Sequence, residues 1–337
     1  MSLLTNTSPN ITVLMSCYNA TRWLNEAITS VLNQTYTDFE FIIVDDGSSD
    51  NTLEIIQQFS AIDSRIVVIT KPNSGLADSL NMGIQKARGE WIARLDADDL
   101  CTPDRLEKQY AIALAKPKLV FIGSGLTIID KDGIPQKTYR YPYKHNTLLN
   151  HLTTHRAFPA HSSAFYRTSA VLSIGGYRIR IRRSQDSDLW LRLFEIGQFA
   201  CIKEPLVFIR KHSAQISHDD GGNRQIIDAN LALTSYFLRR NGYLDPIAGD
   251  QNYFETYLAW ITKQLEDHEV FDFSQNREHL KRLFKKSHYS FSAFADFIKV
   301  ALTHPILTLR LFIYPIRGNT LPQQLALAWI KAQQNNF

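Results

Sequence analysis

Short apolar runs alternate with amphipathic stretches over the first hundred residues of this 337-residue chain. Uninterrupted apolar runs are typical of parallel strands buried on both faces. Apolar positions three or four residues apart indicate helices with one buried face. The pattern predicts strands at 11–16, 41–44, 66–69 and 91–95, and helices near 24–32, 51–61 and 75–87. Strands that alternate with helices in this way predict an open, mostly parallel α/β sheet.

Polar and acidic residues follow the predicted strands. Tyr18 follows the first strand and Asp46 the second, and a cluster of three carboxylates, Asp96, Asp98 and Asp99, follows the fourth. In an open α/β sheet, ligands bind outside the carboxyl ends of the strands. Carboxylates this close together favour a hard divalent cation, which leaves coordination sites for substrate phosphates. The alternative is a solvated acidic turn ahead of the next helix.

The same positions suit a nucleoside diphosphate. Tyr18 offers a flat ring on which a base can stack, and Asp46 can accept the imide N–H of a uracil. Each has a structural alternative, because a tyrosine after a strand is often a half-buried packing residue. The segment around Asp46 also fits a turn whose side chains cap a helix.

An ordered series of motifs resembles glycosyltransferase family 2. The series covers residues 10–217, and its order is far more specific than any single motif. Its members are Ser16 to Asn19, Ser30 to Tyr36, Val44 to Asp50, Asn73 to Ala77, Asn81 to Ile84, Ala87 to Ile92, Leu95 to Asp99 and Pro103 to Leu106. The resemblance implies the Rossmann-like A-type glycosyltransferase fold and an inverting, metal-assisted transfer from a nucleotide sugar.

Carried over residue by residue, the resemblance also implies a set of donor contacts. The implied nucleotide contacts are Ser16, Tyr18, Asp46 and Asp96. Asp98 and Asp99 would bind manganese or magnesium. The metal would neutralise the charge that develops on the departing diphosphate, as a Lewis acid does.

An inverting transfer also needs a base for the acceptor hydroxyl. In the family this is the aspartate of a Glu-Asp pair that opens a helix, and the matching pair here is Gln185 and Asp186. The resemblance therefore implies that Asp186 is the general base. Gln185 keeps the size and reach of the glutamate on the acceptor side but lacks its charge. The alternative is that Asp186 and Asp188 only favour the helix N-terminus electrostatically.

Two histidines extend this site. His161 precedes a predicted strand at 164–167 and resembles a segment that lines the acceptor side of the cleft. His212 lies where some relatives supply a histidine near the metal or diphosphate. Arg210 and Lys211 are alternative diphosphate contacts. For each histidine the alternative is a structural or solvent-exposed side chain.

Composition fits a globular enzyme with an appendage. Apolar residues make up 44% of the chain, enough for a full core, and the formal net charge is +4. The three cysteines show no metal-ligand spacing, which favours a reducing compartment over a disulfide framework. The first sixteen residues lack a basic start and a long apolar core, so we expect no secretory leader and a cytoplasmic location.

The second part of the chain differs in character. We predict a catalytic domain at 1–218 and a helical, basic region at 219–337, with breaks near 221–222 and 241–242. Residues 275–337 contain nine Lys or Arg and two acids. Apolar residues recur at helical spacing in 291–316, but charges interrupt them before the roughly 18 residues that a membrane span needs. The two interpretations are a peripheral contact with an anionic membrane surface and a helical extension that packs on protein.

Other classes fit less well. No Gly-x-Gly-x-x-Gly follows the early strands, which argues against a dinucleotide-binding oxidoreductase. A nucleotidyltransferase would have a glycine-rich basic loop after the first strand, and an inactive sugar-binding relative would have lost the acids. The C-terminal aromatic residues are not patterned as stacking platforms for nucleic acid. The sequence thus predicts a glycosyltransferase that uses a uridine diphosphate sugar and builds a surface polysaccharide or lipid-linked glycan.

Overall fold

The computed structural model describes residues 8–212, 223–268, 270–271, 298 and 320–334. The chain divides into two compact units. The first unit comprises Met1–Asn150 and Ala157–Gln215, and the second comprises His151–Arg156 and Ile216–Phe337.

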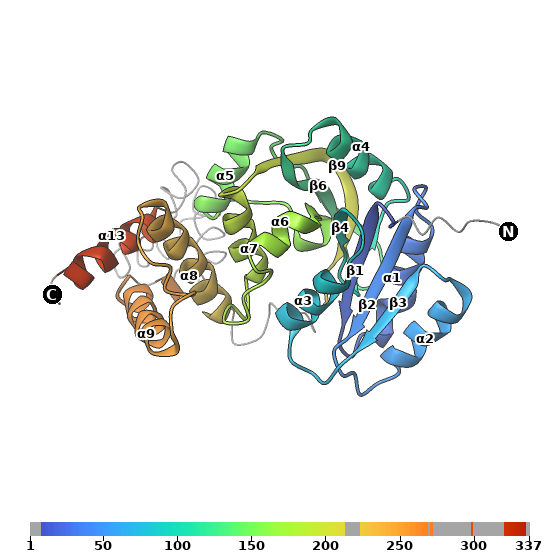
Figure 1. Ribbon diagram of the computed structural model, residues 1–337, viewed down its shortest axis with the longest axis horizontal. Coiled ribbons are helices and arrows are strands. Elements are labelled where there is room, and N and C mark those ends of the chain that lie inside the picture. Colours follow the sequence, from blue (N-terminus) through green and yellow to red (C-terminus); the bar gives the residue numbers. More distant parts are fainter. Residues whose placement is uncertain (1–7, 213–222, 269, 272–297, 299–319, 335–337) are drawn as a thin grey trace. The chain divides into compact units, whose positions relative to one another are not determined.

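The first unit begins with four parallel strands joined by helices (Figure 1). These elements are β1 (Ile11–Cys17), α1 (Thr21–Leu32), β2 (Phe39–Asp45), α2 (Thr52–Ile62), β3 (Ile66–Thr70), α3 (Leu76–Lys86) and β4 (Trp91–Arg94). Every residue of β2 is buried, as expected for a parallel strand with both faces covered. The strands and helices predicted for this part are confirmed, with boundaries that differ by at most a few residues.

The second half of this unit is more irregular. Its elements are β5 (Leu100–Cys101), α4 (Arg105–Ala115), β6 (Leu119–Ile129), β7 (Pro135–Tyr139), α5 (His145–Thr153), the 3₁₀ turn η1 (His161–Ser163), β8 (Phe165–Arg167), α6 (Thr168–Ser173), α7 (Gln185–Phe194) and β9 (Gln198–Arg210). The long strands β6 and β9 were not predicted. The strand at β8 and the helices α4 and α7 were.

All these strands form one mixed sheet with the order β3-β2-β1-β4-β8-β6-β9-β5, and β7 pairs with β6. β1 pairs in parallel with both β2 and β4, so the chain order reverses at β1. β8 lies antiparallel between β4 and β6, and it joins the parallel first half to the parallel pair of β6 and β9. The predicted mixed sheet with a parallel Rossmann-like part is confirmed.

Aromatic packing fixes α7 against the second half of the sheet. The rings of Phe194 and Phe199 stack with centroids 3.6 Å apart, and Phe121 lies 4.6 Å from both Phe199 and Trp190. Such aromatic pairs contribute about 0.5–1.5 kcal/mol each beyond their burial. The middle and the end of α7 are therefore anchored, through Trp190 and Phe194, to aromatic residues of β6 and β9.

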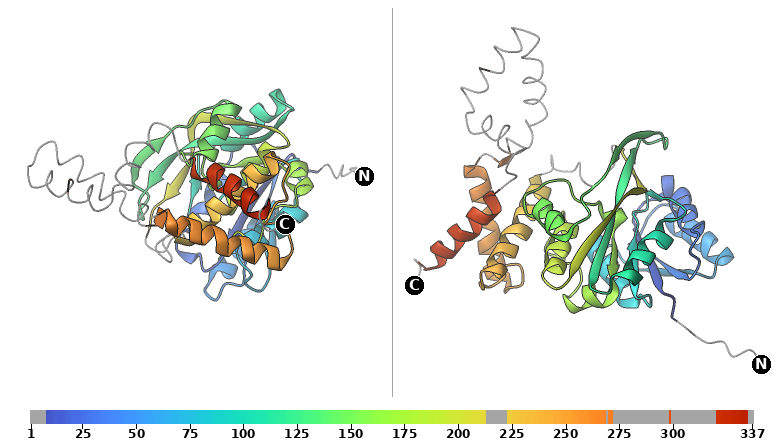
Figure 2. Two further views of the ribbon diagram at one scale, coloured as in Figure 1. Left: turned by 90° about the vertical axis from the view of Figure 1, so that its left-hand side faces the viewer. Right: turned by 90° about the horizontal axis from the view of Figure 1, so that it is seen from above.

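The described part of the second unit is helical (Figure 2). Its helices are α8 (Asn223–Arg240), α9 (Gln251–Asp267) and α13 (Leu321–Gln334). α8 contacts both α9 and α13, and the rings of Tyr257, Trp260 and Trp329 pack together. Gly242, with a φ of +76° in the left-handed region that glycine tolerates, follows the end of α8 at the predicted break. Among the described residues, no helix is both long and apolar enough to cross a membrane.

The remaining predictions for the second part fall outside the described residues. The break at 221–222 lies there, and so do the basic residues of 275–297 and nearly all of the amphipathic stretch 291–316. The contact with an anionic membrane surface stays a prediction.

Candidate active site

The reversal of strand order at β1 defines the place where the predicted site residues gather. In open α/β sheets this switch point forms the crevice that binds ligands. The carboxyl ends of β1 and β4 flank it, and the N–H of Leu95 donates to the carbonyl of Leu14 at 3.1 Å. Tyr18 follows β1 and Asp96 follows β4, so the structure brings these two predicted residues to neighbouring strand ends.

The loop after β1 is held to the loop after β2. Asn19 has a φ of +49°, and its Oδ1 accepts a hydrogen bond of 2.9 Å from the N–H of Ser49. The N–H of Asn19 donates to Ser48 Oγ at 3.0 Å. Tyr18 directly precedes these hydrogen bonds, and 54% of its surface is exposed. Ser16 is half-buried within β1. The exposed ring of Tyr18 thus stands on a loop with a fixed conformation.

Asp46 anchors the loop between β3 and α3. It is buried, and its carboxylate accepts bonds from the N–H groups of Ser74 at 3.0 Å and Gly75 at 2.9 Å and pairs with Lys71. Burial raises the pKa of Asp46, but the bonds from Lys71, Ser74 and Gly75 outweigh it and hold the pKa below its ordinary value. The geometry gives Asp46 a structural function, and its contact with uracil stays a prediction.

Ser162 of η1 connects the acidic cluster to the second half of the sheet. Its Oγ lies 2.7 Å from Oδ2 of Asp96 and 2.5 Å from Oδ2 of Asp99. A hydroxyl group has one proton and two lone pairs, so it can donate to only one of these carboxylates at a time. Arg94, which is fully buried, forms an ion pair with Asp96. Sequence reasoning missed both Ser162 and Arg94, because neither belongs to the acidic motif itself.

Burial and mutual repulsion shape the protonation of the cluster. Burial and then the carboxylates of its neighbours raise the pKa of Asp99 well above its ordinary value. Burial and then Asp96 raise the pKa of Asp98. Asp96 differs because Arg94 outweighs the effect of burial and lowers its pKa. A nearby cation would relieve the repulsion that remains between these carboxylates.

Asp98 meets His212 at the end of β9. Nε2 of His212 lies 2.9 Å from Oδ2 of Asp98, and the ring of His212 packs on that of Trp23 with centroids 4.2 Å apart. Trp23 in turn donates from Nε1 to the carbonyl of Lys131 at 3.1 Å. Nδ1 of His212 is buried without a hydrogen-bond partner in the described part of the chain. Trp23 therefore fixes the ring plane of His212 against Asp98.

Arg210 completes this support. It is 1% exposed, its N–H donates to Oδ1 of Asp99 at 2.9 Å, and its Nε donates to the carbonyl of Asp98 at 3.0 Å. Its Nη2 donates to Oε2 of Glu26 at 2.7 Å. The guanidinium thus bonds to protein groups and positions the acidic cluster. The sequence had suggested that Arg210 contacts the diphosphate, whereas these bonds give it a supporting position.

The donor set fits a divalent ion that is shared with substrate. Within the described residues, no three His, Cys, Asp or Glu side chains form a group that could hold a metal by themselves. Asp98 and His212 do converge, whereas both oxygens of Asp99 accept bonds from Ser162 and Arg210. Magnesium and manganese are often bound by one or two protein ligands, with water and phosphates in the remaining positions. An open site of this kind fits the pair of Asp98 and His212.

Asp186 lies in the first turn of α7, after Ser184 with a φ of +53°. The N–H of Ser187 donates to Oδ1 of Asp186 at 2.7 Å. Burial raises the pKa of Asp186, and the charges of Arg94 and Asp96 also act on it. The structure therefore brings the predicted base into the electrostatic field of the predicted nucleotide contact, although 90 residues separate Asp186 from Asp96.

The neighbours of Asp186 have different environments. Asp188 is buried and pairs with Arg192 at 2.8 Å and with Arg178 at 3.5 Å. Asp188 therefore secures the N-terminal turns of α7 through ion pairs. Gln185 is the first residue of the helix and is half-buried.

His161 belongs to η1 and contacts the hydroxyl of Tyr177 through Nε2 at 2.7 Å. Burial, followed by the charge of Arg94, lowers the pKa of His161 well below its ordinary value, so the ring is neutral at pH 7. Asn81 holds the backbone of Tyr177 from both sides, with bonds of 2.7 and 2.8 Å. His161 is thus a neutral, fixed group close to Asp96, whose charge also acts on it.

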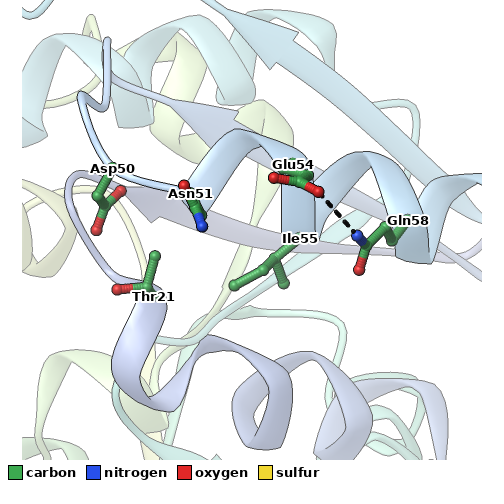
Figure 3. A pocket seen from close by; sticks show the side chains of 6 residues that line it. All are labelled: Thr21, Asp50, Asn51, Glu54, Ile55 and Gln58. Atoms are coloured by element: carbon green, nitrogen blue, oxygen red, sulfur yellow. Dashed lines mark hydrogen bonds between the residues drawn. The ribbon is translucent and has the colours of Figure 1, made fainter.

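A separate hollow of about 430 Å³ lies between the first turns of α1 and α2 (Figure 3). Its lining consists of Thr21, Asp50, Asn51, Glu54, Ile55 and Gln58, and Gln58 donates to Glu54 at 3.3 Å. None of the predicted site residues lines it.

Sequence comparison places this arrangement in a family. The model of the family described as glycosyl transferase family 2 matches residues 12–175. The O-antigen biosynthesis glycosyltransferase WbnJ of Escherichia coli is 34% identical over 186 residues, which cover 54% of this chain and 71% of WbnJ. The chain belongs to glycosyltransferase family 2. The family that the motifs predicted is therefore confirmed.

Solved structures show the fold of this family 2 enzyme. TarS 1–349 of S. aureus, in complex with UDP-GlcNAc, has a TM-score of 0.58 and 18% identity, covering 68% of this chain and 66% of that one. The mannosyltransferase PcManGT of Pyrobaculum calidifontis, in complex with GDP-Man and Mn²⁺, has a TM-score of 0.53 and 16% identity, covering 92% and 87%. The predicted A-type glycosyltransferase fold is confirmed. The chain spans just under two thirds of the TarS fragment.

Proposed function

We propose that this family 2 glycosyltransferase is an inverting enzyme that moves a sugar from a uridine diphosphate sugar to a hydroxyl group of a glycan or lipid-linked acceptor. One observation carries the proposal. The charges of Arg94 and Asp96 at the switch point act on the carboxyl group of Asp186, which lies on α7. A carboxylate of raised pKa close to a donor site has the chemistry of a general base.

The donor would bind at the carboxyl ends of β1, β2 and β4. Tyr18 stacks on the base, Ser16 and Asp46 complete the base pocket, and Asp96 accepts a hydrogen bond from the ribose. Asp98 and His212 would hold manganese or magnesium, which would supply Lewis-acid stabilisation of the diphosphate when bound. Asp99 supports this site without contacting the donor, because its carboxylate oxygens bond to Ser162 and to the N–H of Arg210.

The transfer exchanges one bond at the anomeric carbon for another. The acceptor oxygen bonds to that carbon on the face opposite the diphosphate, the bond from the carbon to the phosphate oxygen breaks, and the diphosphate leaves. Asp186 takes the proton of the acceptor hydroxyl. His161 and Gln185 lie on the acceptor side, where a neutral imidazole and an amide orient hydroxyl groups without competing for the proton.

The biological product is proposed from the relatives. WbnJ is named for O-antigen biosynthesis, which makes a surface polysaccharide or its lipid-linked precursor the favoured acceptor. The three cysteines are buried and free, in line with work at the cytoplasmic face of the membrane. Two other functions remain to be tested, a nucleotidyltransferase and an inactive sugar-nucleotide-binding relative. The retained carboxylates argue against the inactive relative.

Calorimetric titration with nucleotides tests the donor site. We expect uridine diphosphate to bind in the presence of manganese and to bind far more weakly after chelation. Asp98→Asn should remove the metal dependence, whereas Asp132→Asn, an exposed acid in the turn between β6 and β7, should not. Guanosine diphosphate is the informative competitor because PcManGT was solved with GDP-Man. Preference for guanosine would overturn the uridine assignment, and no nucleotide binding at all would overturn the proposed function.

A further inference from the structure

Exposed basic residues and one aromatic residue lie on β7, in the segment that follows it and in β9. We name this group the Tyr143 patch, and its residues are Lys137, Arg140, Tyr143, Lys144 and Lys203, all exposed. The ring of Tyr143 is 52% exposed, and Nζ of Lys203 lies 5.0 Å and Nζ of Lys144 5.9 Å from its centroid. Two ammonium groups thus share one exposed ring.

A bulge in β9 produces this arrangement. Ser124 of β6 pairs with Ile202, but the next residue, Gly125, pairs with Pro205, so two extra residues are accommodated in β9. Bulges redirect side chains away from the regular alternation of a strand, and this one includes Lys203. Gly125 is required here because an added Cβ would lie 2.7 Å from the carbonyl oxygen of Lys203 and 2.9 Å from that of Tyr139.

The cations of the patch have no acidic partner among the described residues. No carboxylate of the described chain forms an ion pair with Lys137, Arg140, Lys144 or Lys203. Glu204, the neighbour of Lys203, pairs instead with Lys108 at 2.6 Å. Unpaired like charges around one ring repel each other, and an anion that bridges them would remove this repulsion.

The patch is linked to the active site through β7. Tyr139 at the end of β7 is opposite Leu126, and Pro135 at its start is opposite Ile129. The turn before β7 is attached to the site, because the carbonyl of Lys131 accepts bonds from Trp23 at 3.1 Å and Arg210 at 3.3 Å. The five residues of β7 span roughly 13 Å at about 3.3 Å per residue. An extended polymer can therefore contact the patch while its end lies near Asp98.

We infer that the Tyr143 patch binds an acidic segment of the glycan acceptor, at a distance from the hydroxyl that reacts. The inference rests on the proposed function for the identity of the acceptor. An exposed aromatic ring offers an apolar face to the C–H groups of a sugar, and the flanking ammonium groups pair with its carboxylate or phosphate substituents. A membrane surface fits less well, because stable insertion needs several apolar side chains, and Tyr143 is the one exposed large hydrophobic residue of the patch.

The test uses the full chain and a labelled oligomer of galacturonic acid, with a neutral maltooligosaccharide of equal length as comparison. Fluorescence anisotropy measures binding to the wild type, to Tyr143→Ala and to the double variant Lys144→Ala/Lys203→Ala. The matched control is Lys86→Ala/Lys118→Ala, which removes the same charge from other exposed positions. We expect the wild type to prefer the acidic oligomer and to lose affinity as salt increases. Each patch variant should bind about three- to tenfold more weakly, as expected for one or two exposed contacts.

Three results would overturn the inference. They are equal affinity for the acidic and neutral oligomers, equal loss in the control variant, and binding of phosphatidylglycerol vesicles through Tyr143 without binding of the glycan. Titration with uridine diphosphate and manganese on the same proteins separates the two proposals. If the nucleotide binds and the acidic oligomer does not, the patch inference fails alone. If neither binds, the proposed function fails with it.

Discussion

The replacement Asp186→Asn tests the general base with little change to the structure. Oδ1 of Asp186 accepts the N–H of Ser187 at 2.7 Å, and an asparagine can keep that bond through its own Oδ1. The turn of α7 should therefore stay folded. The replacement removes Oδ2, the oxygen that remains to take the acceptor proton. General base catalysis contributes about 10²–10⁴ in rate, so the barrier should rise by roughly 3–5.5 kcal/mol at about 1.4 kcal/mol per tenfold.

The assay follows release of uridine diphosphate with and without an acceptor, over pH 4 to 9. Because burial raises the pKa of Asp186 and the base acts when deprotonated, wild-type kcat/KM should fall as pH decreases through that raised pKa. The variant should bind donor normally, lose 10²- to 10⁴-fold in kcat, and lose this acidic limb. Turnover within about fivefold of the wild type, or an unchanged acidic limb, would refute the assignment.

Three further changes test the surroundings. Gln185→Glu restores the family's acidic pair, and a second carboxylate should raise the pKa of Asp186 and move the acidic limb of the pH profile to higher pH. An unmoved limb would contradict this. Trp23→Leu removes the ring that packs on His212, so manganese-dependent binding of uridine diphosphate should weaken by about two- to tenfold, a loss of roughly 0.5–1.5 kcal/mol. Unchanged calorimetric affinity would show that His212 needs no such support. Asp188→Ala leaves Arg192 buried without its carboxylate, so the free energy of unfolding in urea should fall by about 3–5 kcal/mol. The exposed control Asp132→Ala should leave the midpoint unchanged, and equal shifts would argue against the buried pair.

The first half of the fold was predictable because its signal is local. Each strand of β1 to β4 is a short apolar run, and β1, β2 and β4 are each followed by residue types that suit a ligand. Consecutive parallel strands with both faces buried leave few other arrangements for such runs. The motifs then singled out the acidic cluster, Asp186 and the two histidines as candidates without any knowledge of their distances.

The second half was less predictable because its signal is not local. β6 contains two glycines and β9 contains a charged bulge, so neither reads as a plain alternation of apolar and polar residues. Residues that support the site also escaped detection. Ser162 and Trp23 carry no recognisable motif, and Arg210 was considered only as a diphosphate contact. The functions of these three residues depend on partners that are 63 to 189 residues away in sequence. The possible membrane contact of 291–316 lies outside the described residues and stays a prediction.

The position of β8 has a consequence for recombining this enzyme with its relatives. β8 joins the half of the sheet with the proposed donor site to the half that is followed by α7, and Ser162, just before β8, binds carboxylates that follow β4. Arg210 reaches back in the same way from β9 to Asp99. In a chimera joined after α4, the acidic cluster would therefore come from one parent, and the residues at positions 162 and 210 that support it would come from the other. Exchange of acceptor specificity between family members should succeed where the incoming half brings equivalents of Ser162 and Arg210, and should yield folded but weakly nucleotide-binding hybrids where it does not.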